Sequence, residues 1–388
     1  MALGVRRGSR GLEFGFMQRC STICRPDWPS RVETLGLTYH THEQGPYWDE
    51  SAYYQLSGAE VDILERAANE LHELCLEAAQ KVVEAGWWER LSIPEAAVSS
   101  LVKSWEREDF SLYGRFDLAY DGSGPPKLLE YNADTPTALV EASVVQWFWL
   151  REQFPMSDQF NSIHERLIET WKASGFGRVH FSAVRDQAED EQTILYLEDT
   201  CHQAGLVTKR TAIDELGWHS LRKHFVDQDE QVVTHAFKLY PWEWMWAEEF
   251  GAYLEESGTC FIEPCWKMLL SNKGLLPILW ELNPGHPNLL PCYEQPGALG
   301  GSFVRKPKLS REGANVTIYE GGEELASVGG DYGEEGFVYQ ARARVADFGG
   351  SRPVMGVWIV GNEAAGLGIR EDSGWITRNT SRFVPHLF

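Results

Sequence analysis

Residues 114–138, GRFDLAYDGSGPPKLLEYNADTPTA, predict a β-hairpin around which the rest of the chain can be organised. Two runs of alternating polarity, RFDLAY and KLLEYNAD, flank the breaker DGSGPP, a composition typical of a turn between antiparallel strands. A turn centred between Ser123 and Gly124 fixes the register of the two strands. The hairpin therefore specifies which side chains lie opposite one another.

That register gathers polar side chains into one patch. Side chains two residues apart share a face of a strand, so Arg115 and Asp117 point one way, and Glu130 and Asn132 do the same. Arg115 then lies opposite Asn132, and Asp117 lies opposite Glu130. Because like charges placed opposite each other are unfavourable, we expect a cation between the two carboxylates. A magnesium ion carrying nucleotide phosphates fits this place; the alternative is a solvated sheet face with an ordinary Arg–Asp ion pair.

The composition limits the kinds of partner that the protein is expected to bind. The 388 residues predict two or three lobes, and 43% hydrophobic with 24% charged residues is typical of a soluble globular protein with a large core. A net charge of −22 argues against nucleic acid, and no apolar run is long enough to cross a membrane. The negative charge suits a cationic ligand such as a polyamine; the alternative is the general solubility of a cytosolic protein. The sequence does not predict an oligomeric state.

The cysteines and the first residues bear on the compartment. The seven cysteines are scattered without the spacing of a zinc site, which favours a reduced, cytoplasmic protein. Residues 1–16 are basic and glycine-rich but lack the apolar core of a secretory signal. We expect them to be a disordered extension, with Met17 as an alternative start.

The remaining patterns divide the chain into segments. Capping boxes at Ser57 and Ser92 predict two helices in a region of helices and cap that runs, with the hairpin, over 17–160. Strands alternating with helices predict a small parallel-sheet α/β lobe at 161–260, with its third strand at 231–236 and one amphipathic helix at 241–253. The last segment, 261–388, is rich in short apolar runs and is expected to be mostly sheet.

That last segment supplies groups that the acidic hairpin lacks. Lys273 and Lys306 are two cations, and the loop at 309–316 carries Gly313, whose neighbourhood lets backbone N–H groups approach phosphate oxygens. Arg370 follows near the end. Together with the hairpin these are the parts needed to hold a nucleoside triphosphate and stabilise a transferring phosphoryl group. Each lysine taken singly is more simply a surface lysine.

Other site types have less support. The sequence contains neither a P-loop nor a dinucleotide fingerprint, and no nucleophile elbow. His286, in NPGHPN, is a candidate acid or base, but a turn histidine is the simpler interpretation. A metal-dependent hydrolase using Asp117 and Glu130 would leave the lysines and the Arg311 loop unexplained.

Six stretches carry a family resemblance: RFDLAYDGSGPPKLLEYNADTPT, EPCWKMLLSNKGLLPILWELNPGHPNLL, FVRKPKLSREGANV, FVYQARARV, GNEAAGLGIRED and SRFVPHLF. They resemble the synthetase domain of the glutathionylspermidine synthases, a branch of the ATP-grasp ligases, and with weaker similarity between them they cover nearly all of 17–388. The acidic strands precede the lysines, as in the permuted members of that group. The resemblance implies an α+β / α/β, circularly permuted ATP-grasp fold with an inserted small parallel-sheet lobe of the pre-ATP-grasp type.

The resemblance also implies roles for single residues. By this resemblance the metal ligands are Asp117, Glu130 and Asn132, and the ATP-binding residues are Lys273, Lys306, Arg311, Gly313 and Gln340. The arginines that steady the transferred phosphoryl group are Arg115 and Arg370. The hydroxyls that hold the acid substrate are those of Thr135 and Thr137. The family has serines at the last two positions, so we expect a different acid substrate. The residues before the hairpin read as helices and cap, so the amidase activity of the bifunctional members is not expected.

The implied function is an ATP- and Mg²⁺-dependent carboxylate–amine ligase. A carboxylate attacks the γ-phosphate of ATP to give an acyl phosphate, which an amine captures as an amide; magnesium, two lysines and two arginines offset the charge. The substrates would be a peptide-like acid and an amine, polyamines included, with pockets near 186–191 and 238–243. The alternative is a nucleotide-binding protein without turnover that keeps the fold for regulation or partner binding.

Overall fold

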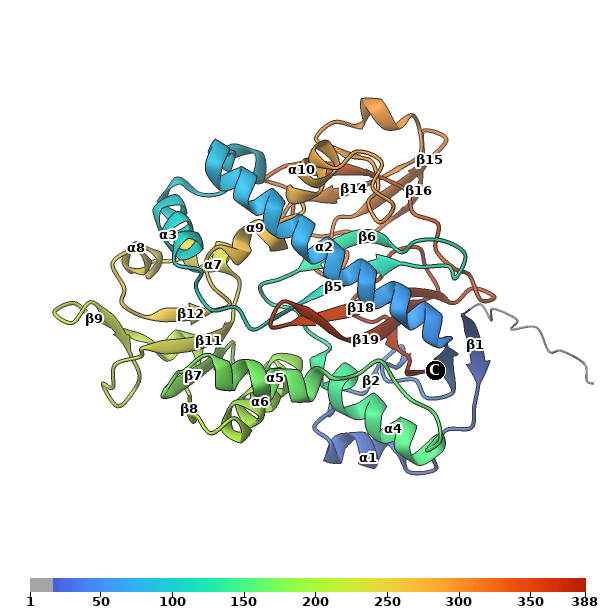
Figure 1. The fold of residues 1–388 in the computed structure, drawn as a ribbon, viewed down its shortest axis with the longest axis horizontal. Helices are drawn as coiled ribbons and strands as arrows, with labels where there is room; N and C mark the ends of the chain where they lie inside the picture. Colours follow the sequence, from blue (N-terminus) through green and yellow to red (C-terminus); the bar gives the residue numbers. More distant parts are fainter. Residues whose placement is uncertain (1–16) are drawn as a thin grey trace, which may run out of the picture.

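The computed structural model of the protein describes residues 17–388, so the prediction for 1–16 lies outside the described residues. The elements form a mixed α/β fold in which several sheets meet around the acidic hairpin (Figure 1). No helix within 17–388 combines the length and the apolar character needed to span a bilayer.

The central sheet contains the predicted hairpin and is antiparallel, in the order β20-β19-β18-β5-β6. In sequence order its strands are β5 (Tyr113–Ala119), β6 (Lys127–Asn132), β18 (Arg352–Val360), β19 (Glu363–Asp372) and β20 (Arg382–Phe383). The predicted register is confirmed: Arg115 pairs with Asn132, and Asp117 pairs with Glu130. The alternate residues Phe116 and Tyr131 stack with their ring centroids 3.8 Å apart, so one face of the hairpin is apolar and the other polar.

Helix α2 (Gly58–Ala85) covers the apolar face of this sheet and crosses it diagonally in Figure 1. The predicted capping box is confirmed, because the Glu60 backbone N–H donates to Ser57 Oγ and the Ser57 backbone N–H donates to Glu60 Oε2. Leu64 and Leu71 are fully buried along the inner stripe of the helix. Gly86 ends the helix in the left-handed conformation.

The second predicted capping box, at Ser92, is wrong. Helix α3 (Glu95–Glu106) has Pro94 at its N-cap and no side-chain cap. The Ser92 hydroxyl instead donates to the Glu335 carbonyl at 2.9 Å and accepts from Lys308 Nζ at 3.0 Å. A long-range contact has therefore taken the hydroxyl that the local pattern assigned to the helix.

The small parallel sheet has the order β12-β11-β7-β8, with α5 (Ile163–Ala173) and α6 (Ala188–Gln203) packed on it. Its strands are β7 (Arg178–Ala183), β8 (Val207–Arg210), β11 (His235–Leu239) and β12 (Cys260–Ile262). The third strand begins at His235 rather than at residue 231, because Asp227 Oδ1 accepts from the Gln231 N–H and closes a turn there. A short antiparallel hairpin, β9 (Gly217–His219) and β10 (His224–Val226), extends from this sheet.

The single helix predicted over 241–253 is also wrong. The chain forms two short helices, α7 (Trp242–Ala247) and α8 (Gly251–Leu254). Glu248 adopts an extended backbone conformation between them. A side chain at Gly251 would meet the carbonyl oxygens of Met245 and Trp246 at 2.8 and 2.7 Å, so the two helices fold tightly against each other at this break.

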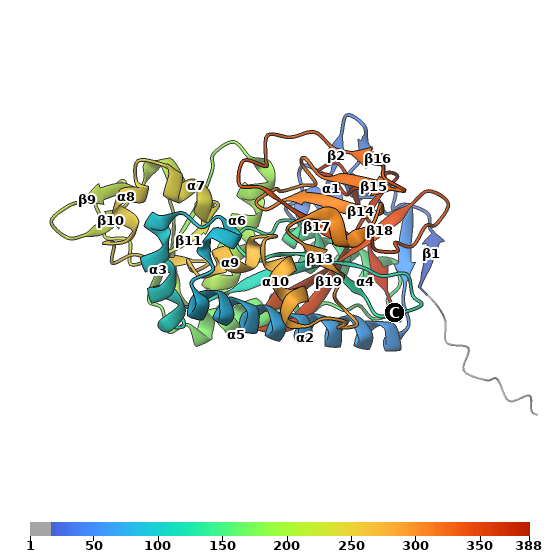
Figure 2. The same ribbon diagram turned by 90° about the horizontal axis from the view of Figure 1, so that it is seen from above.

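The third sheet is antiparallel, in the order β13-β17-β14-β15-β16. Its strands are β13 (Cys292–Tyr293), β14 (Phe303–Pro307), β15 (Thr317–Glu320), β16 (Glu323–Ser327) and β17 (Phe337–Ala341), preceded by α9 (Lys267–Ser271) and α10 (Leu275–Leu282). Figure 2 shows α2 along one side of the central sheet and the β14–β16 sheet toward the other. The polar face of the hairpin is therefore turned toward the third sheet, not toward α2.

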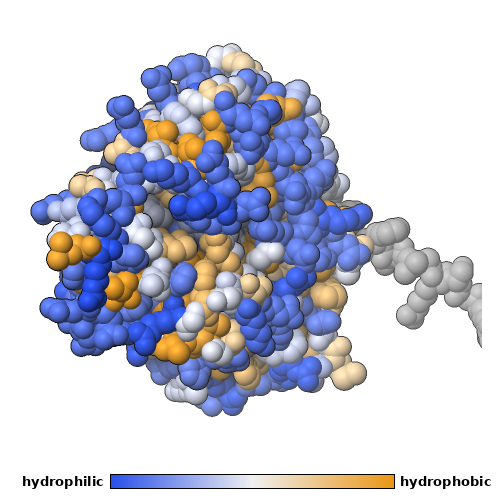
Figure 3. Space-filling view, turned by 60° about the vertical axis from the view of Figure 1, so that its left-hand side comes forward, coloured by the Kyte–Doolittle hydropathy of each residue, from blue (hydrophilic) through white to orange (hydrophobic). Residues whose placement is uncertain are grey.

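The remaining elements surround these sheets. They are β1 (Gln18–Ser21), α1 (Trp28–Thr34), β2 (Thr41–His42), β3 (Gly45–Pro46), β4 (Ala52–Gln55), a π-helical turn (Glu141–Val145) that leads into α4 (Gln146–Gln153), and β21 (His386–Leu387). Short 3-10 helices lie at Trp88–Leu91, Ile213–Glu215 and Pro296–Leu299. On the face drawn in Figure 3, hydrophilic side chains cover most of the surface, and a recessed strip of more hydrophobic residues lies near the centre. That distribution agrees with the 24% of charged residues in the sequence.

Candidate active site

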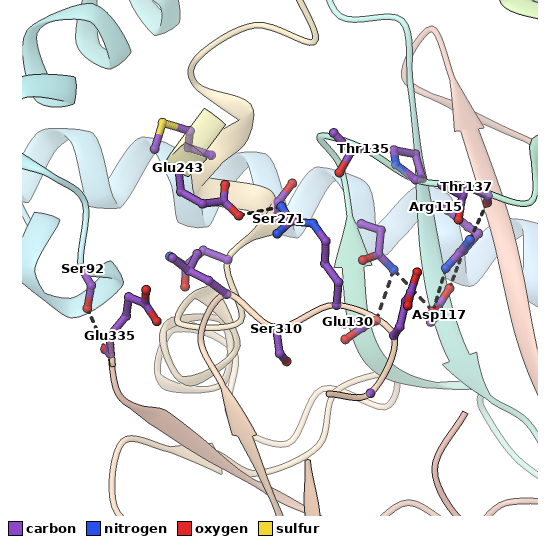
Figure 4. Close-up of a pocket in the computed structure, with 18 of the residues that line it drawn as sticks. Ser92, Arg115, Asp117, Glu130, Thr135, Thr137, Glu243, Ser271, Ser310 and Glu335 are labelled. Atoms are coloured by element: carbon purple, nitrogen blue, oxygen red, sulfur yellow. Dashed lines mark hydrogen bonds and ion pairs between the residues drawn. The ribbon is translucent and has the colours of Figure 1, made fainter. Parts of the chain in front are cut away.

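The polar face of the β5–β6 hairpin forms the centre of the candidate site (Figure 4). Arg115 Nε lies 2.7 Å from Asp117 Oδ1, and Asn132 Nδ2 donates to Glu130 Oε1 at 3.2 Å. Burial opposes the charge on Arg115, but the nearby carboxylates of Asp117 and Glu130 together raise the pKa of the guanidinium. The patch predicted from strand periodicity is thus present with the expected neighbours.

Both predicted lysines reach this patch from the third sheet and its helices. Lys273 Nζ lies 3.0 Å from Glu130 Oε2 and donates to the Ser310 carbonyl at 2.5 Å. Lys306, on β14, donates to Gln340 Oε1 at 2.7 Å and to the Leu129 carbonyl at 2.9 Å. Residues more than 140 positions apart in the chain, such as Glu130 and Lys273, are therefore in direct contact.

The charges of the lysines and the hairpin carboxylate shift one another. Burial penalises the charged form of Glu130, yet Lys273 and Lys306 outweigh it and lower the pKa of this carboxyl to about 2. Burial lowers the pKa of Lys306 to about 8, although Glu130 opposes the shift. Glu130 is consequently an anion at neutral pH, and Lys306 is a cation that little extra desolvation would neutralise.

The cation expected between the carboxylates is supplied in part by the chain itself, through Arg115 and Lys273. Asp117, Glu130 and Asn132 nevertheless offer the oxygen donors that Mg²⁺ prefers. Among the described residues, no group of three or more His, Cys, Asp or Glu side chains could hold a metal. Two carboxylates and an amide suit an ion that arrives with phosphate ligands of its own.

Two cavities meet at this patch. The larger has a volume of about 330 Å³ and the smaller about 130 Å³, and both are lined by Asp117, Glu130, Gly313 and Thr377. The hairpin carboxylates therefore stand at the junction of two compartments. Ligands in the two compartments can therefore meet beside these carboxylates.

The smaller cavity has a largely apolar wall from the third and central sheets. Lys306 and Gln340 are among its polar lining residues. Its aliphatic lining residues are Leu129, Val304, Val316, Ile318, Val345, Val354 and Ile376. Near these walls the Trp375 ring lies against the Arg342 and Arg352 guanidinium groups, 4.6 and 4.0 Å from its centroid. A flat aromatic ligand with a charged end matches this lining.

The larger cavity holds the remaining predicted residues. Thr135, Thr137, Arg311 and Arg370 line it. Arg115 Nη1 donates to the Thr137 carbonyl at 2.6 Å, which ties the threonine loop to the acidic patch. Arg370 donates to the carbonyls of residues 378 and 379, and its Nε is buried without a partner. These groups give the larger cavity cationic and hydroxyl donors suited to a carboxylate.

Acidic side chains gather near the same cavity. Burial, together with Glu189 and Glu312, raises the pKa of Asp190 to about 7. Burial and Glu189 likewise raise the pKa of Glu141 to about 7, while hydrogen bonds from two tyrosine hydroxyls oppose the shift. Such mutual repulsion among carboxylates is relieved when a cation binds among them.

All twelve predicted site residues fall in this region, eleven on the two cavities and Lys273 in contact with Glu130. His286 lies elsewhere and contacts Glu70 Oε1 at 3.1 Å. Sequence reasoning missed Ser92, Glu335 and Trp375 as lining residues. No local pattern marks Glu335 or Trp375, and the pattern at Ser92 predicted a helix cap instead. All three join the cavities through long-range packing.

Comparison with known proteins identifies the family of this chain. Residues 19–388 match the family described as glutathionylspermidine synthase preATP-grasp. A Haemophilus influenzae protein named "Putative acid--amine ligase" is 42% identical over 383 residues, covering 94% of this chain and 97% of that protein.

More distant relatives are longer than this chain. Trypanothione synthetase from Crithidia fasciculata is 31% identical over 81% of this chain, and the bifunctional glutathionylspermidine synthetase/amidase of Escherichia coli is 27% identical over 88%. This chain spans only 53% and 59% of those two proteins. A glutathione synthetase-like effector from Globodera pallida has a similar fold, with a TM-score of 0.58 at 11% identity over 94% of this chain and 99% of that one.

Proposed function

Because the chain belongs to the glutathionylspermidine synthase family, we propose that it is an ATP- and Mg²⁺-dependent ligase that joins an acid to an amine. The relatives named above are synthetases or ligases, which supports the reaction class. We also propose that the fold is a circularly permuted ATP-grasp fold, since the acidic hairpin precedes the lysines in the chain. The small parallel sheet is then the inserted pre-ATP-grasp lobe on the substrate side.

One observation carries this proposal. Two carboxylates, an amide and two lysines converge where an apolar cavity meets a polar one. In the proposed arrangement the base of ATP occupies the smaller cavity beside Gln340. Its phosphates lie at the junction near Lys273 and Lys306, and the acid and the amine occupy the larger cavity.

The proposed reaction transfers the γ-phosphoryl group of ATP to the carboxylate of the acid, and the amine nitrogen then displaces phosphate to form an amide and release a proton. Magnesium, held by Asp117, Glu130 and Asn132, would supply positive charge to the phosphate oxygens. Lys273 and Lys306 add fixed cations at the same place. Charge neutralisation is the main requirement, because an anion must approach another anion.

The other residues position the acid. Arg115 and Arg370 are proposed to steady the phosphoryl group in transfer, and Thr135 and Thr137 to hold the acid through hydroxyl hydrogen bonds. The loop that carries Arg311 and Gly313 is proposed to cover the phosphates. Two threonine methyl groups narrow this part of the cavity relative to the serines of the resembling proteins, which favours a different peptide-like acid.

The acidic group near the larger cavity is proposed to receive the amine. Burial and the neighbouring charge of Glu189 raise the pKa values of Glu141, Asp190 and Glu312. A protonated amine or polyamine would relieve that repulsion. This placement also uses the segment at 186–191, for which the sequence predicts a substrate pocket.

A turnover assay tests the proposal. We expect ADP and phosphate release only when both an acid and an amine are present, across a panel of peptide acids and polyamines. Lys306→Ala and Asp117→Ala should each reduce that release by roughly 10²–10³-fold, the usual effect of removing one preorganised charge. Lys127→Ala is the matched control and should retain the rate, because this half-buried lysine on β6 of the same hairpin lines neither cavity and donates to the Pro287 carbonyl instead.

Two results would contradict this assignment. Unchanged release in Lys306→Ala and Asp117→Ala would place the chemistry elsewhere. Tight binding of Mg-ATP by isothermal titration, with no turnover for any acid–amine pair, would favour the alternative of a nucleotide-binding protein that acts in regulation or partner binding.

A further inference from the structure

The loop that carries the two threonines and the loop that carries Gly313 are joined by one segment of the small lobe. We define the acid loop as residues 133–138, the glycine loop as residues 309–316, and the bridge segment as residues 238–243, KLYPWE. The bridge segment runs from the end of β11 into the start of α7. It contacts both loops.

The first contact is a buried ion pair. Lys238 Nζ lies 2.6 Å from Asp134 Oδ1, and the two side chains are 0% and 2% exposed. The second oxygen of Asp134 accepts from the Trp242 backbone N–H at 3.0 Å, and Lys238 also donates to the Tyr240 carbonyl at 2.9 Å. Both carboxylate oxygens of Asp134 are therefore held by the bridge segment.

Asp134 immediately precedes Thr135, which lines the larger cavity, but neither Asp134 nor Lys238 lines either cavity. The pair consequently cannot act by touching a substrate there. Burying two charges is costly unless both are paired, so the contact fixes the acid loop in one position relative to the small lobe.

The second contact reaches the glycine loop. Arg311 Nη2 lies 2.6 Å from Glu243 Oε1, and the Arg311 guanidinium lies over the Trp244 ring, 5.6 Å from its centroid. Figure 4 shows Glu243 on the side of the larger cavity opposite Arg115 and Asp117. Arg311 lines this cavity, and its Nη1 is buried without a hydrogen-bond partner, so the guanidinium retains donors that can bind an anion.

We propose that Asp134, Lys238 and Glu243 are positioning residues that couple the glycine loop to the acid loop through the bridge segment. An anion bound by Arg311 alters the ion pair between Arg311 and Glu243. Because the bridge segment is short and held at both ends, this change is transmitted to Asp134. By reciprocity the acid loop influences the glycine loop to the same extent. This inference rests on the proposed function, because it takes a nucleotide as the ligand of the glycine loop.

Hydrogen exchange with the non-hydrolysable analogue Mg-AMP-PNP tests the coupling without knowledge of the acid. In the wild type we expect the analogue to slow exchange by roughly tenfold in peptides covering both loops, the scale of ordinary coupling between sites. In Asp134→Asn/Lys238→Met, which removes both buried charges and keeps their volumes, slowing should persist in the glycine loop and disappear from the acid loop. Glu243→Gln should give the same pattern.

The control and the contrary outcomes distinguish a failure of the coupling from a failure of the proposed function. Lys209→Met breaks an ion pair with Asp227 in the same lobe, away from both loops. In this variant the analogue should still slow hydrogen exchange in the peptides of both loops. If the analogue still slows exchange in the acid loop of the double variant, coupling through the bridge segment is overturned. The effect on the acid loop would then be assigned to the Arg115–Thr137 contact. No slowing of the glycine loop in the wild type would overturn nucleotide binding there, and the proposed function with it.

Discussion

The charge of Lys306 gives the candidate site a pH dependence that a binding measurement can detect. Burial lowers the pKa of its amine to about 8, and only the protonated form attracts phosphate. We therefore predict that the affinity for Mg-AMP-PNP is nearly level around pH 7 and falls about tenfold for each pH unit above 8. The sign follows because binding above pH 8 must take up a proton. Isothermal titration across this range measures the effect.

Lys306→Arg is the control for that pH dependence. A guanidinium stays protonated through the whole range, so the decline above pH 8 should be absent in this variant. A decline at the same pH in both proteins would show that another group titrates. The pKa of Glu130, lowered to about 2, means that loss of its charge does not interfere with the measurement.

At the scale of residues, the sequence predicted the acidic patch well and its surroundings poorly. Strand periodicity dictates which of Arg115, Asp117, Glu130 and Asn132 share a face, so the patch follows from local rules. Glu335 reaches the same cavity from a loop before β17, and no local rule relates it to the hairpin. Side chains that join a site through long-range packing leave no periodic signal.

Gly313 is the position at which a single methyl group should most disturb the glycine loop. Its φ is +70°, and a Cβ atom there would meet the Thr377 carbonyl oxygen at 2.5 Å and Ile376 Cγ2 at 2.8 Å. We predict that Gly313→Ala displaces the loop and raises the KM for ATP at least tenfold, while the melting temperature changes little. Steady-state kinetics and thermal unfolding measure the two effects.

Gly321→Ala is the matched control, because Gly321 has a similar φ of +62° but open space around its Cβ position. Both substitutions carry the cost of a left-handed backbone, and only Gly313→Ala adds the clash. Equal KM values in the two variants would mean that the loop does not contact the nucleotide.

Elements were predictable where local signals agreed with tertiary packing. The Ser57 capping box and Gly86 bound α2 as expected, because the same helix also has a continuous apolar stripe to bury. The similar signal at Ser92 failed, since Lys308 and Glu335 offered that hydroxyl better partners. The start of β11 and the break between α7 and α8 depend on a turn at Asp227 and on close backbone packing at Gly251, which periodicity does not register.

For the whole molecule, the site lies where the central and third sheets meet, so a bound nucleotide should stabilise the fold globally. At 100 times its Kd, Mg-AMP-PNP is expected to raise the free energy of unfolding by about 2.7 kcal/mol, because it binds the native state only. Urea unfolding with and without the analogue measures this increase. Asp117→Ala should lose most of the gain at the same concentration, whereas a full gain in that variant would remove Asp117 from the nucleotide site.

The central sheet has a consequence for how the protein is made. Strand β5 pairs with β6, which follows it closely, and on its other edge with β18, at residues 352–360. A ribosome delivers residues in order, so the growing chain holds its acidic hairpin with one edge open until β18 and β19 have been synthesised. Such pairing gives a high contact order, which slows folding and leaves strand edges exposed. The carboxylates at the centre of the site are translated before the strands that enclose them, so the site is complete only after β18 and β19 have been synthesised.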